Sequence, residues 1–474
     1  MRSTISHPLS TSGELHQEIL QCCLLDGWLR SEIAAVLTET KRWNKRLRRL
    51  PADLVLTLVL LMGAARSLSV PLLLMLVGDH LRRSDPSIPL KDWVTEEAFY
   101  HARKRLGVEP AMALFERTAA GVKPSRSFLG LRPWGLDGTT LTVPDTESNV
   151  EAFGRPGTSE GQAAFPLLSL ISLIDTTTRR IRDVVLGRYK ACERDACVYL
   201  TRHLGKDDVL FVDAGVTASW LLKYFKDANV HYVARASENC YPTILRELGP
   251  GDYLVEVDVW ETIPRPEGDT RRRKRHISGR IRLRMIEYKV PGHDRVRLFT
   301  DLEDPLAYPA LDIVTGYHLR WECELGFDEI KTHQLAPARG TVPTSLRSKT
   351  PEGVLQEAFG MLTVYNIVRS LMTTAAKLND IDPLQISFIQ SVHALRLTIP
   401  RLISAGPGDR ASIIADLVQD LSSCRNPRSR RPRQCPRAVK KRGTHFPAKR
   451  DRDRERPLPV EIRRIPTATG MAAP

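Results

Sequence analysis

Between residues 134 and 213, the apolar residues follow an order of strands and turns that few folds can accommodate. Three strand patterns come first, at Trp134 to Val143, Phe165 to Asp175 and Ile181 to Gly187, with turn residues between them. A helical pattern then runs from Arg194 to Leu204, and a short apolar strand follows from Val209 to Asp213. These patterns predict an α/β domain.

Three strands joined by tight turns, then a helix and another strand, are how a ribonuclease-H-like α/β fold begins. In that topology the first and fourth strands are neighbours. Asp137 lies within the first strand and Asp213 ends the fourth, so their carboxylates could converge. An acid at the end of an apolar strand, followed by glycine, is more often an ordinary strand-to-loop transition. Each aspartate, taken by itself, therefore remains ambiguous.

The segments on either side have a different character. Residues up to about 125 show helical spacing, at Asp26 to Leu37 and Ala52 to Ala65. Residues 237–312 are rich in proline, glycine and charge and predict a β-rich insertion. Helices resume from Gly316, and Gly353 to Lys377 is a long amphipathic candidate. We expect five regions. They are a helical N-terminal DNA-binding or dimerisation domain (1–125), the first part of the core (126–236), the insertion (237–312), the last part of the core with C-terminal helices (313–420) and a basic tail (421–474).

The charge of the chain favours a polyanionic partner. The formal net charge is +15 and the pI is about 9.6. Between Cys424 and Pro457, fourteen lysines and arginines face three acidic residues, so this proline-containing tail supplies most of the excess. We expect the tail to be disordered and to adhere to DNA. It has hardly any apolar residues to insert, which argues against a membrane-surface protein.

The chain carries no sign of a membrane segment or an export signal. The N-terminus lacks the apolar centre of a signal peptide. The longest apolar stretch, from Leu54 to Ala65, is shorter than the roughly 20 residues that span a bilayer. We expect a cytoplasmic protein.

Two further basic segments are candidates for DNA contact. Thr95 is a plausible N-cap for a short helix that ends at Gly107. Its cations could read a major groove, although a solvated surface helix is the favoured explanation when this segment is taken alone. The β-rich insertion contains a second basic run. The candidates are Arg103, Lys104 and Arg105 in the helix, and Arg271, Arg272 and Arg273 in the insertion.

The most informative segment runs from Tyr317 to Lys331. On a regular helix, Tyr317, Arg320, Glu324 and Lys331 fall on one narrow face. An exposed face carrying an Arg320–Glu324 ion pair is the simpler explanation. A surface helix, however, has no need to align a tyrosine and a distant lysine with that pair. One carboxylate among three phosphate-binding groups fits an active site for a phosphodiester.

These residues match a known pattern, Tyr-x₂-Arg-x₃-Glu-x₆-Lys, at every position. The chain thereby resembles the insertion-sequence DDE transposases of the IS-four type. The run from Leu136 to Thr146 with Phe153-Gly154 resembles that family's first-aspartate region. Asp213-Ala214-Gly215 resembles its second, although Val216 replaces a more usual aromatic. The resemblance covers residues from about 20 to 375.

The resemblance implies a ribonuclease-H-like catalytic core with a β-rich insertion between Asp213 and Glu324. Asp137, Asp213 and Glu324 would bind two Mg²⁺ (or Mn²⁺) ions, and Tyr317, Arg320 and Lys331 would hold DNA phosphates. The partners implied are double-stranded DNA, with the element's terminal inverted repeats and a target, and a second copy of the chain in a synaptic homodimer. Trp260 is a candidate for gripping a flipped base, although a core tryptophan at a strand end is the more ordinary interpretation.

Two other functions would use the same fold. A ribonuclease-H-like nuclease would cut DNA without joining it. The three carboxylates do not distinguish it from a transposase, but the basic helix face and the insertion favour strand transfer. A catalytically inactive DNA-binding regulator is disfavoured because every signature residue is present. The sequence therefore favours a transposase that cleaves and transfers DNA strands in a metal-dependent reaction.

Overall fold

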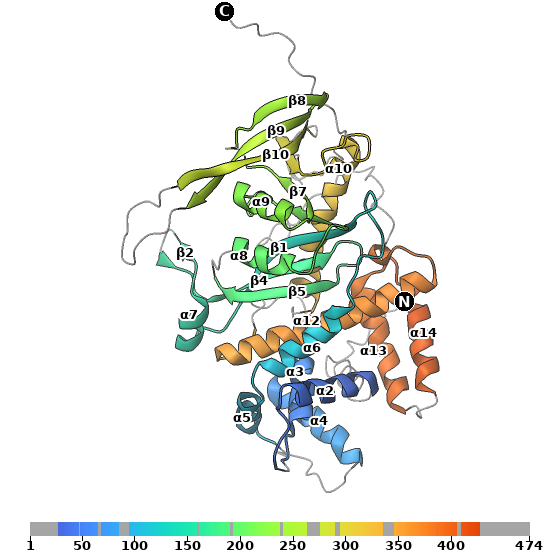
Figure 1. Cartoon of the computed structure of the whole chain (residues 1–474). Helices are drawn as coiled ribbons and strands as arrows, with labels where there is room; N and C mark the ends of the chain where they lie inside the picture. Colours follow the sequence, from blue (N-terminus) through green and yellow to red (C-terminus); the bar gives the residue numbers. More distant parts are fainter. Residues whose placement is uncertain are drawn as a thin grey trace, which may run out of the picture.

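One large twisted sheet runs through the molecule, with helices on both faces (Figure 1). The computed structural model describes residues 27–426, apart from 47, 65–67, 85–93, 159–160, 190–192, 238–239, 263–274, 290–293, 335–345 and 405–408. The basic tail from residue 427 onward and the run Arg271 to Arg273 lie outside the described residues.

Nine strands of the described chain form this sheet, in the order β5-β4-β1-β6-β7-β11-β10-β9-β8. Their bounds are β1 Arg132–Thr142, β4 Leu167–Asp175, β5 Ile181–Arg188, β6 Asp208–Val212, β7 His231–Arg235, β8 Thr243–Gly249, β9 Asp252–Thr262, β10 Arg275–Lys289 and β11 Arg295–Thr300. β2 (Gly157–Thr158) and β3 (Gly161–Gln162) form a small separate pair.

The first half of the sheet agrees closely with the sequence prediction. The four expected strands are β1, β4, β5 and β6, and the expected helix between them is α8 (Glu193–Thr201). β1 pairs antiparallel with β4 on one side and parallel with β6 on the other, as the predicted topology requires. β1, which carries Asp137, and β6, which Asp213 follows directly, are therefore neighbours.

The predicted β-rich segment continues the same sheet. β11 pairs with β7, and β10, β9 and β8 follow outward in antiparallel order. In Figure 1 these strands form the end of the molecule opposite to the N-terminal helices. The segment 237–312 thus lengthens the core sheet in one direction.

α3, α5 and α6 of the N-terminal helices pack against one long helix, α12 (Pro351–Leu378), which runs between the sheet and most of these helices (Figure 1). α2 and α4 pack on the other N-terminal helices, and α6 also contacts β5. α3 is buried on nearly its whole circumference, as its almost wholly apolar sequence requires. One continuous apolar core joins these helices, α12 and the adjoining sheet face. The helices are α2 Gly27–Glu39, α3 Ala52–Ala64, α4 Val70–Ser84, α5 Glu96–Leu106 and α6 Glu109–Ala120.

The two faces of the sheet are covered by different elements. α8 and α9 (Ser219–Asp227) pack on one face. The opposite face of the central strands is covered by consecutive short elements, namely α10 Ala310–Tyr317, η1 His318–Arg320, α11 Trp321–Asp328 and η2 Glu329–Gln334. The remaining elements are α7 Glu147–Phe153, η3 Pro383–Gln385, α13 Phe388–Ser404 and α14 Arg410–Ser423.

The prediction of one regular helix from Tyr317 to Lys331 is wrong. The segment passes from an α-helix into a 3₁₀ turn at η1, returns to an α-helix in α11, and ends in a π-helical turn at η2. A π turn contains more residues than an α turn, so residues after Asp328 no longer follow a 100° spacing.

Across the described residues, no helix combines the length and apolar character needed to cross a membrane.

We predict that Gly360→Ala destabilises the fold where α3 and α12 cross. A Cβ at residue 360 would lie 2.8 Å from the Val59 carbonyl oxygen, and one at Gly63 would lie 2.6 Å from the Met361 Cα. Separating the helices should lower the free energy of unfolding by about 1–3 kcal/mol, measured by urea denaturation. Gly121→Ala is the control because nothing lies within 4 Å of its Cβ position. Equal stability of the two variants would contradict this packing.

Candidate active site

Asp137 and Asp213 emerge side by side on one face of the sheet. β1 and β6 run parallel, and Leu136 is paired with Val212, so the aspartates follow at matching positions. Side chains alternate between faces along a strand. Leu136 and Val212 point into the core under α8 and α9. Asp137 therefore faces the opposite side, which carries α10 and α11, and Asp213 lines the same pocket there.

α11 lies close to β1 because a glycine leaves room for it. A Cβ at Gly135 would lie 2.2 Å from Sγ of Cys323, and one at Gly316 would lie 2.1 Å from the ring of Phe128. Cys323 is fully buried against the sheet. The next residue, Glu324, consequently reaches the same pocket as the aspartates.

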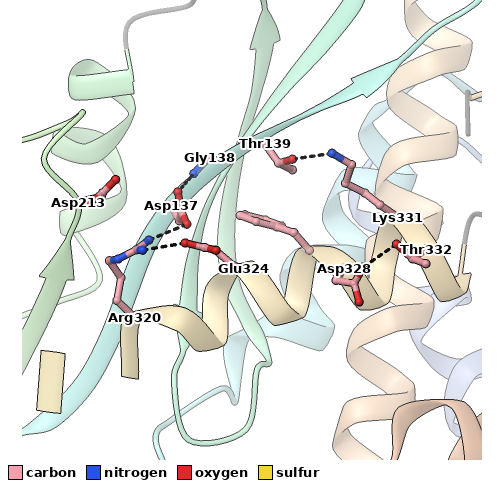
Figure 2. Close-up of a pocket in the computed structure, with 10 residues that line it drawn as sticks. Asp137, Gly138, Thr139, Asp213, Arg320, Glu324, Asp328, Lys331 and Thr332 are labelled. Carbon is pink, nitrogen blue, oxygen red and sulfur yellow. Dashed lines mark hydrogen bonds and ion pairs between the residues drawn. The ribbon is translucent and has the colours of Figure 1, made fainter. Parts of the chain in front are cut away.

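An arginine bridges two of the three carboxylates. Arg320 Nη1 donates to Asp137 Oδ2 at 3.2 Å, and Nη2 donates to Glu324 Oε1 at 2.7 Å. Figure 2 shows these three side chains pointing toward one another, with Asp213 at the edge of the same pocket. The Glu324 side chain is 42% exposed, so the bridge is open to the pocket.

The far end of the pocket carries a second cation. Lys331, in the π turn η2, donates from Nζ to Oγ1 of Thr139 at 3.1 Å (Figure 2). Thr139 lies two residues after Asp137 on β1 and so shares its face. The strand periodicity could have identified Thr139 as a site residue. Asp328 also lines the pocket, where it accepts from the Thr332 hydroxyl.

The neighbouring carboxylates of the pocket affect the pKa of Asp137. Burial raises the pKa of Asp137, and the charges of Glu324 and Asp213 raise it further. The backbone N–H of Gly138, 2.8 Å from Oδ1, and the guanidinium of Arg320 act in the opposite direction. Asp137 thus lies in the field of both other carboxylates.

Tyr317 does not join its predicted partners. Its side chain is buried, and its hydroxyl donates to the Val212 carbonyl oxygen at 3.2 Å. Burial raises its pKa strongly. Its ring belongs to the apolar cluster that contains Val209 and Phe211 of β6, and it is not among the residues that line the pocket, so the prediction that Tyr317 lies with Arg320, Glu324 and Lys331 in one site is wrong. In this structure it supports the end of β6, directly before Asp213.

The prediction of a DNA contact is also wrong for Arg103. Its side chain is buried, donating from Nη2 to the Gly353 carbonyl oxygen at 2.7 Å and from Nε to Oε1 of Gln356 at 3.0 Å. It therefore ties α5 to α12.

The other two cations of α5, Lys104 and Arg105, line a surface hollow together with His101. The Thr95 N-cap is confirmed, because its hydroxyl accepts from the Ala98 N–H at 3.1 Å.

Trp260 is not a core residue. It lies near the end of β9, is 46% exposed, and pairs across the ribbon with Ile277, which is also exposed. The more ordinary interpretation from the sequence is therefore wrong. The position leaves an aromatic surface available on the β-rich segment.

The pocket has the chemistry of a cation site. Its three carboxylates offer the hard oxygen ligands that Mg²⁺ and Mn²⁺ prefer. Within the described residues, no three His, Cys, Asp or Glu side chains are gathered closely enough to hold a metal ion as they stand. Here the guanidinium of Arg320 provides the positive charge between Asp137 and Glu324.

Two family models match the chain in the regions just described. A transposase DDE domain matches residues 136–367, and an insertion element 4 transposase N-terminal domain matches residues 22–116. The transposase InsG for insertion sequence element IS4 of Escherichia coli (strain K12) is 27% identical over 452 residues, covering 94% of this chain and 95% of that protein.

The chain belongs to the insertion-sequence DDE transposases of the IS-four type. It is a DNA transposase, an enzyme that cleaves DNA and transfers strands, and the family implies a divalent metal cofactor. A piggyBac transposase synaptic complex with hairpin DNA is a distant structural match, with 11% identity, a TM-score of 0.40, and coverage of 97% of this chain and 82% of that chain. It is too dissimilar to support a comparison of the sites.

We predict that this transposase becomes more responsive to divalent cations when Arg320 is replaced. In EDTA, Arg320→Gln should cost about 1–2 kcal/mol of stability, because the carboxylates lose their shared counter-charge. Millimolar Mg²⁺ should then raise the melting temperature of the variant more than that of the unsubstituted protein.

The control is Arg280→Gln, which removes an exposed guanidinium that also bridges two carboxylates, Glu256 and Asp258, at 3.1 and 3.2 Å. Its response to Mg²⁺ should equal that of the unsubstituted protein. An equal response in all three proteins would show that Arg320 does not compete with cations at this pocket.

Proposed function

We propose that Asp137, Asp213 and Glu324 are the catalytic carboxylates of this transposase and that they hold two Mg²⁺ or Mn²⁺ ions. The observation that carries the proposal is the convergence of these acids, from three distant segments, on one pocket that also contains Arg320 and Lys331. When bound, the ions would supply activation of the attacking oxygen and stabilisation of the leaving one.

We propose that the two cations of the pocket hold the DNA backbone. Lys331 and Arg320 line the pocket on the same side of the sheet as the carboxylates. A guanidinium and an ammonium both bind phosphate oxygens, the first in a bidentate manner. We propose that these two side chains bind the phosphates next to the scissile bond. Tyr317 supports the backbone directly before Asp213.

The proposed catalytic core is a ribonuclease-H-like unit made of residues 126–236 and 313–420. Its support is the strand order β5-β4-β1-β6-β7, with antiparallel pairing among the first three strands and parallel pairing from β1 to β7. Residues 237–312 form the β-rich insertion, and Trp260 on its surface is proposed to contact DNA.

We propose that residues 1–125 bind DNA and support dimerisation, and that two copies of the chain bring two element ends together in a synaptic complex. The support for the DNA contact is the exposed basic part of α5, with Lys104 and Arg105. The substrates are the terminal inverted repeats of the chain's own element and a target duplex.

The catalytic assignment predicts the outcome of a cleavage assay. DNA carrying the sequences that flank the gene is mixed with the protein in Mg²⁺ or EDTA, and nicking and strand transfer are measured. Asp137→Asn, Asp213→Asn and Glu324→Gln should each slow Mg²⁺-dependent cleavage by roughly a thousandfold, since several kcal/mol of charge stabilisation are lost.

Asp328→Asn is the matched control, because Asp328 lines the same pocket but is not one of the three. It should cleave within a few-fold of the unsubstituted rate. Cleavage that survives substitution of all three acids would place the active site elsewhere. Binding without cleavage would indicate an inactive regulator, and cleavage without strand transfer would indicate a nuclease.

The assignment of α5 predicts a salt-dependent binding defect. Replacing Lys104 and Arg105 with alanine should weaken binding to any DNA sequence and reduce the slope of log affinity against log salt by roughly one per lost phosphate contact. The comparison is Arg103→Leu, which should lower the melting temperature and leave the salt slope unchanged, since Arg103 is buried. An unchanged slope in the double variant would remove α5 from the DNA interface.

A further inference from the structure

The side of α11 that faces away from the pocket carries two more acids. Glu322 and Glu329 are seven residues apart, one before and one after Glu324, and their side chains are only 17% and 9% exposed. Glu329 is also the first residue of the π turn that carries Lys331. The segment therefore displays acids on both sides, with one set in the pocket and the other against the protein interior.

One arginine reaches both of these interior acids. Arg179 donates from Nε to Oε2 of Glu322 and from Nη1 to Oε1 of Glu329, each at 2.6 Å. Both glutamates raise the pKa of Arg179 against the effect of burial, which lowers it, and the net shift is upward. Arg179 thus bridges the α-helical and π-helical parts of the segment.

The backbone of Arg179 is held in an unusual conformation. It lies in the turn between β4 and β5 with φ of +59°, in the left-handed region that residues other than glycine seldom adopt. The buried carboxylate of Asp175 organises this turn by accepting from the Thr177 N–H at 2.8 Å. The sheet therefore presents the guanidinium from a fixed support.

α12 completes the cluster from the other side. Arg369 donates from Nε to Oε2 of Glu329 at 2.9 Å and makes a second, shorter bond to Oε1. The Tyr365 hydroxyl lies 3.1 Å from Oε2 of Glu329 and 3.1 Å from the Arg179 carbonyl oxygen. Two arginines and two glutamates thus balance in charge.

Stability does not account for such a cluster. Burying ions costs desolvation energy, and apolar side chains of similar volume often stabilise a fold as well or better. What directed ion pairs provide is a defined geometry, because each guanidinium bond has a preferred direction and length. The cluster ties α11 and the first residue of the π turn to the turn between β4 and β5 and to α12.

We propose that Arg179 is a positioning residue for DNA cleavage. This role rests on the function proposed above. Arg179 acts through Glu322 and Glu329 to hold α11 and η2 so that Glu324 and Lys331 face Asp137 and Thr139. Arg179 is not among the residues that line the pocket. A displacement of about 1 Å at a reacting centre can slow a reaction by roughly a hundredfold, so this support governs the rate.

The test compares Arg179→Gln with a matched variant far from the site. Arg284 is fully buried and makes an equally close bidentate pair with Asp252, at 2.7 and 2.6 Å, in the β-rich segment. Arg284→Gln breaks one fully buried ion pair, and Arg179→Gln breaks two largely buried ones. Urea denaturation measures their stabilities, and all rates are measured under conditions in which each variant is folded.

Arg179→Gln should lower the single-turnover cleavage rate at saturating DNA by roughly ten- to a hundredfold, with the DNA dissociation constant within about threefold of the unsubstituted value. Arg284→Gln should lose stability and keep its rate. Glu322→Gln, which retains an acceptor for Arg179, should keep more activity than Glu322→Leu. An Arg179→Gln protein that cleaves at the normal rate, or an equal rate loss in Arg284→Gln, would overturn the proposal.

A second measurement does not depend on catalysis. Backbone amide exchange of residues 321–334 should be faster in Arg179→Gln than in the unsubstituted protein, and unchanged in Arg284→Gln. Normal protection of this segment in Arg179→Gln would overturn the positioning role even if no cleavage is found. Absence of cleavage by the unsubstituted protein, with altered exchange in Arg179→Gln, would refute the proposed function and leave the positioning role standing.

Discussion

The arrangement of the site depends on arginines that neutralise acidic side chains on both sides of α11. This short helix and the start of the π turn carry four acids, Glu322, Glu324, Asp328 and Glu329, beside two aspartates on the sheet. Carboxylates held this closely repel one another unless cations lie between them. Arg320 supplies the compensating charge in the pocket, and Arg179 and Arg369 supply it in the interior. The position of Glu324 depends on this balance.

The parts of the fold that could be predicted follow from short-range patterns. The apolar strands had correct approximate bounds because strand periodicity and turn residues are local signals. The meeting of Asp137 and Asp213 followed from topology, because parallel neighbours carry matching positions to the same edge. Thr139 was missed although the same two-residue period places it beside Asp137.

What the sequence could not supply depends on distant partners. Arg103 was assigned to DNA from its basic neighbours, yet it lies on the helix face of Phe99 and Leu106, and Gln356, one of its partners, is 253 residues away. Tyr317 was placed by assuming a regular helix. The 3₁₀ turn η1 contacts β1 and β6, and Glu329 at the start of the π turn bonds Arg369 of α12. A one-dimensional pattern does not contain such contacts.

The two sides of α11 differ in exposure, and this difference suits their tasks. The pairs of Glu329 with Arg179 and Arg369 are buried, where water and salt screen them least, so they persist. The pair of Arg320 with Glu324 opens onto the pocket, where ions and phosphates can compete for both groups. Close packing at Gly135 leaves the helix no room to shift toward the sheet. The interior contacts can therefore stay fixed while the contacts in the pocket are exchanged for those of the substrate.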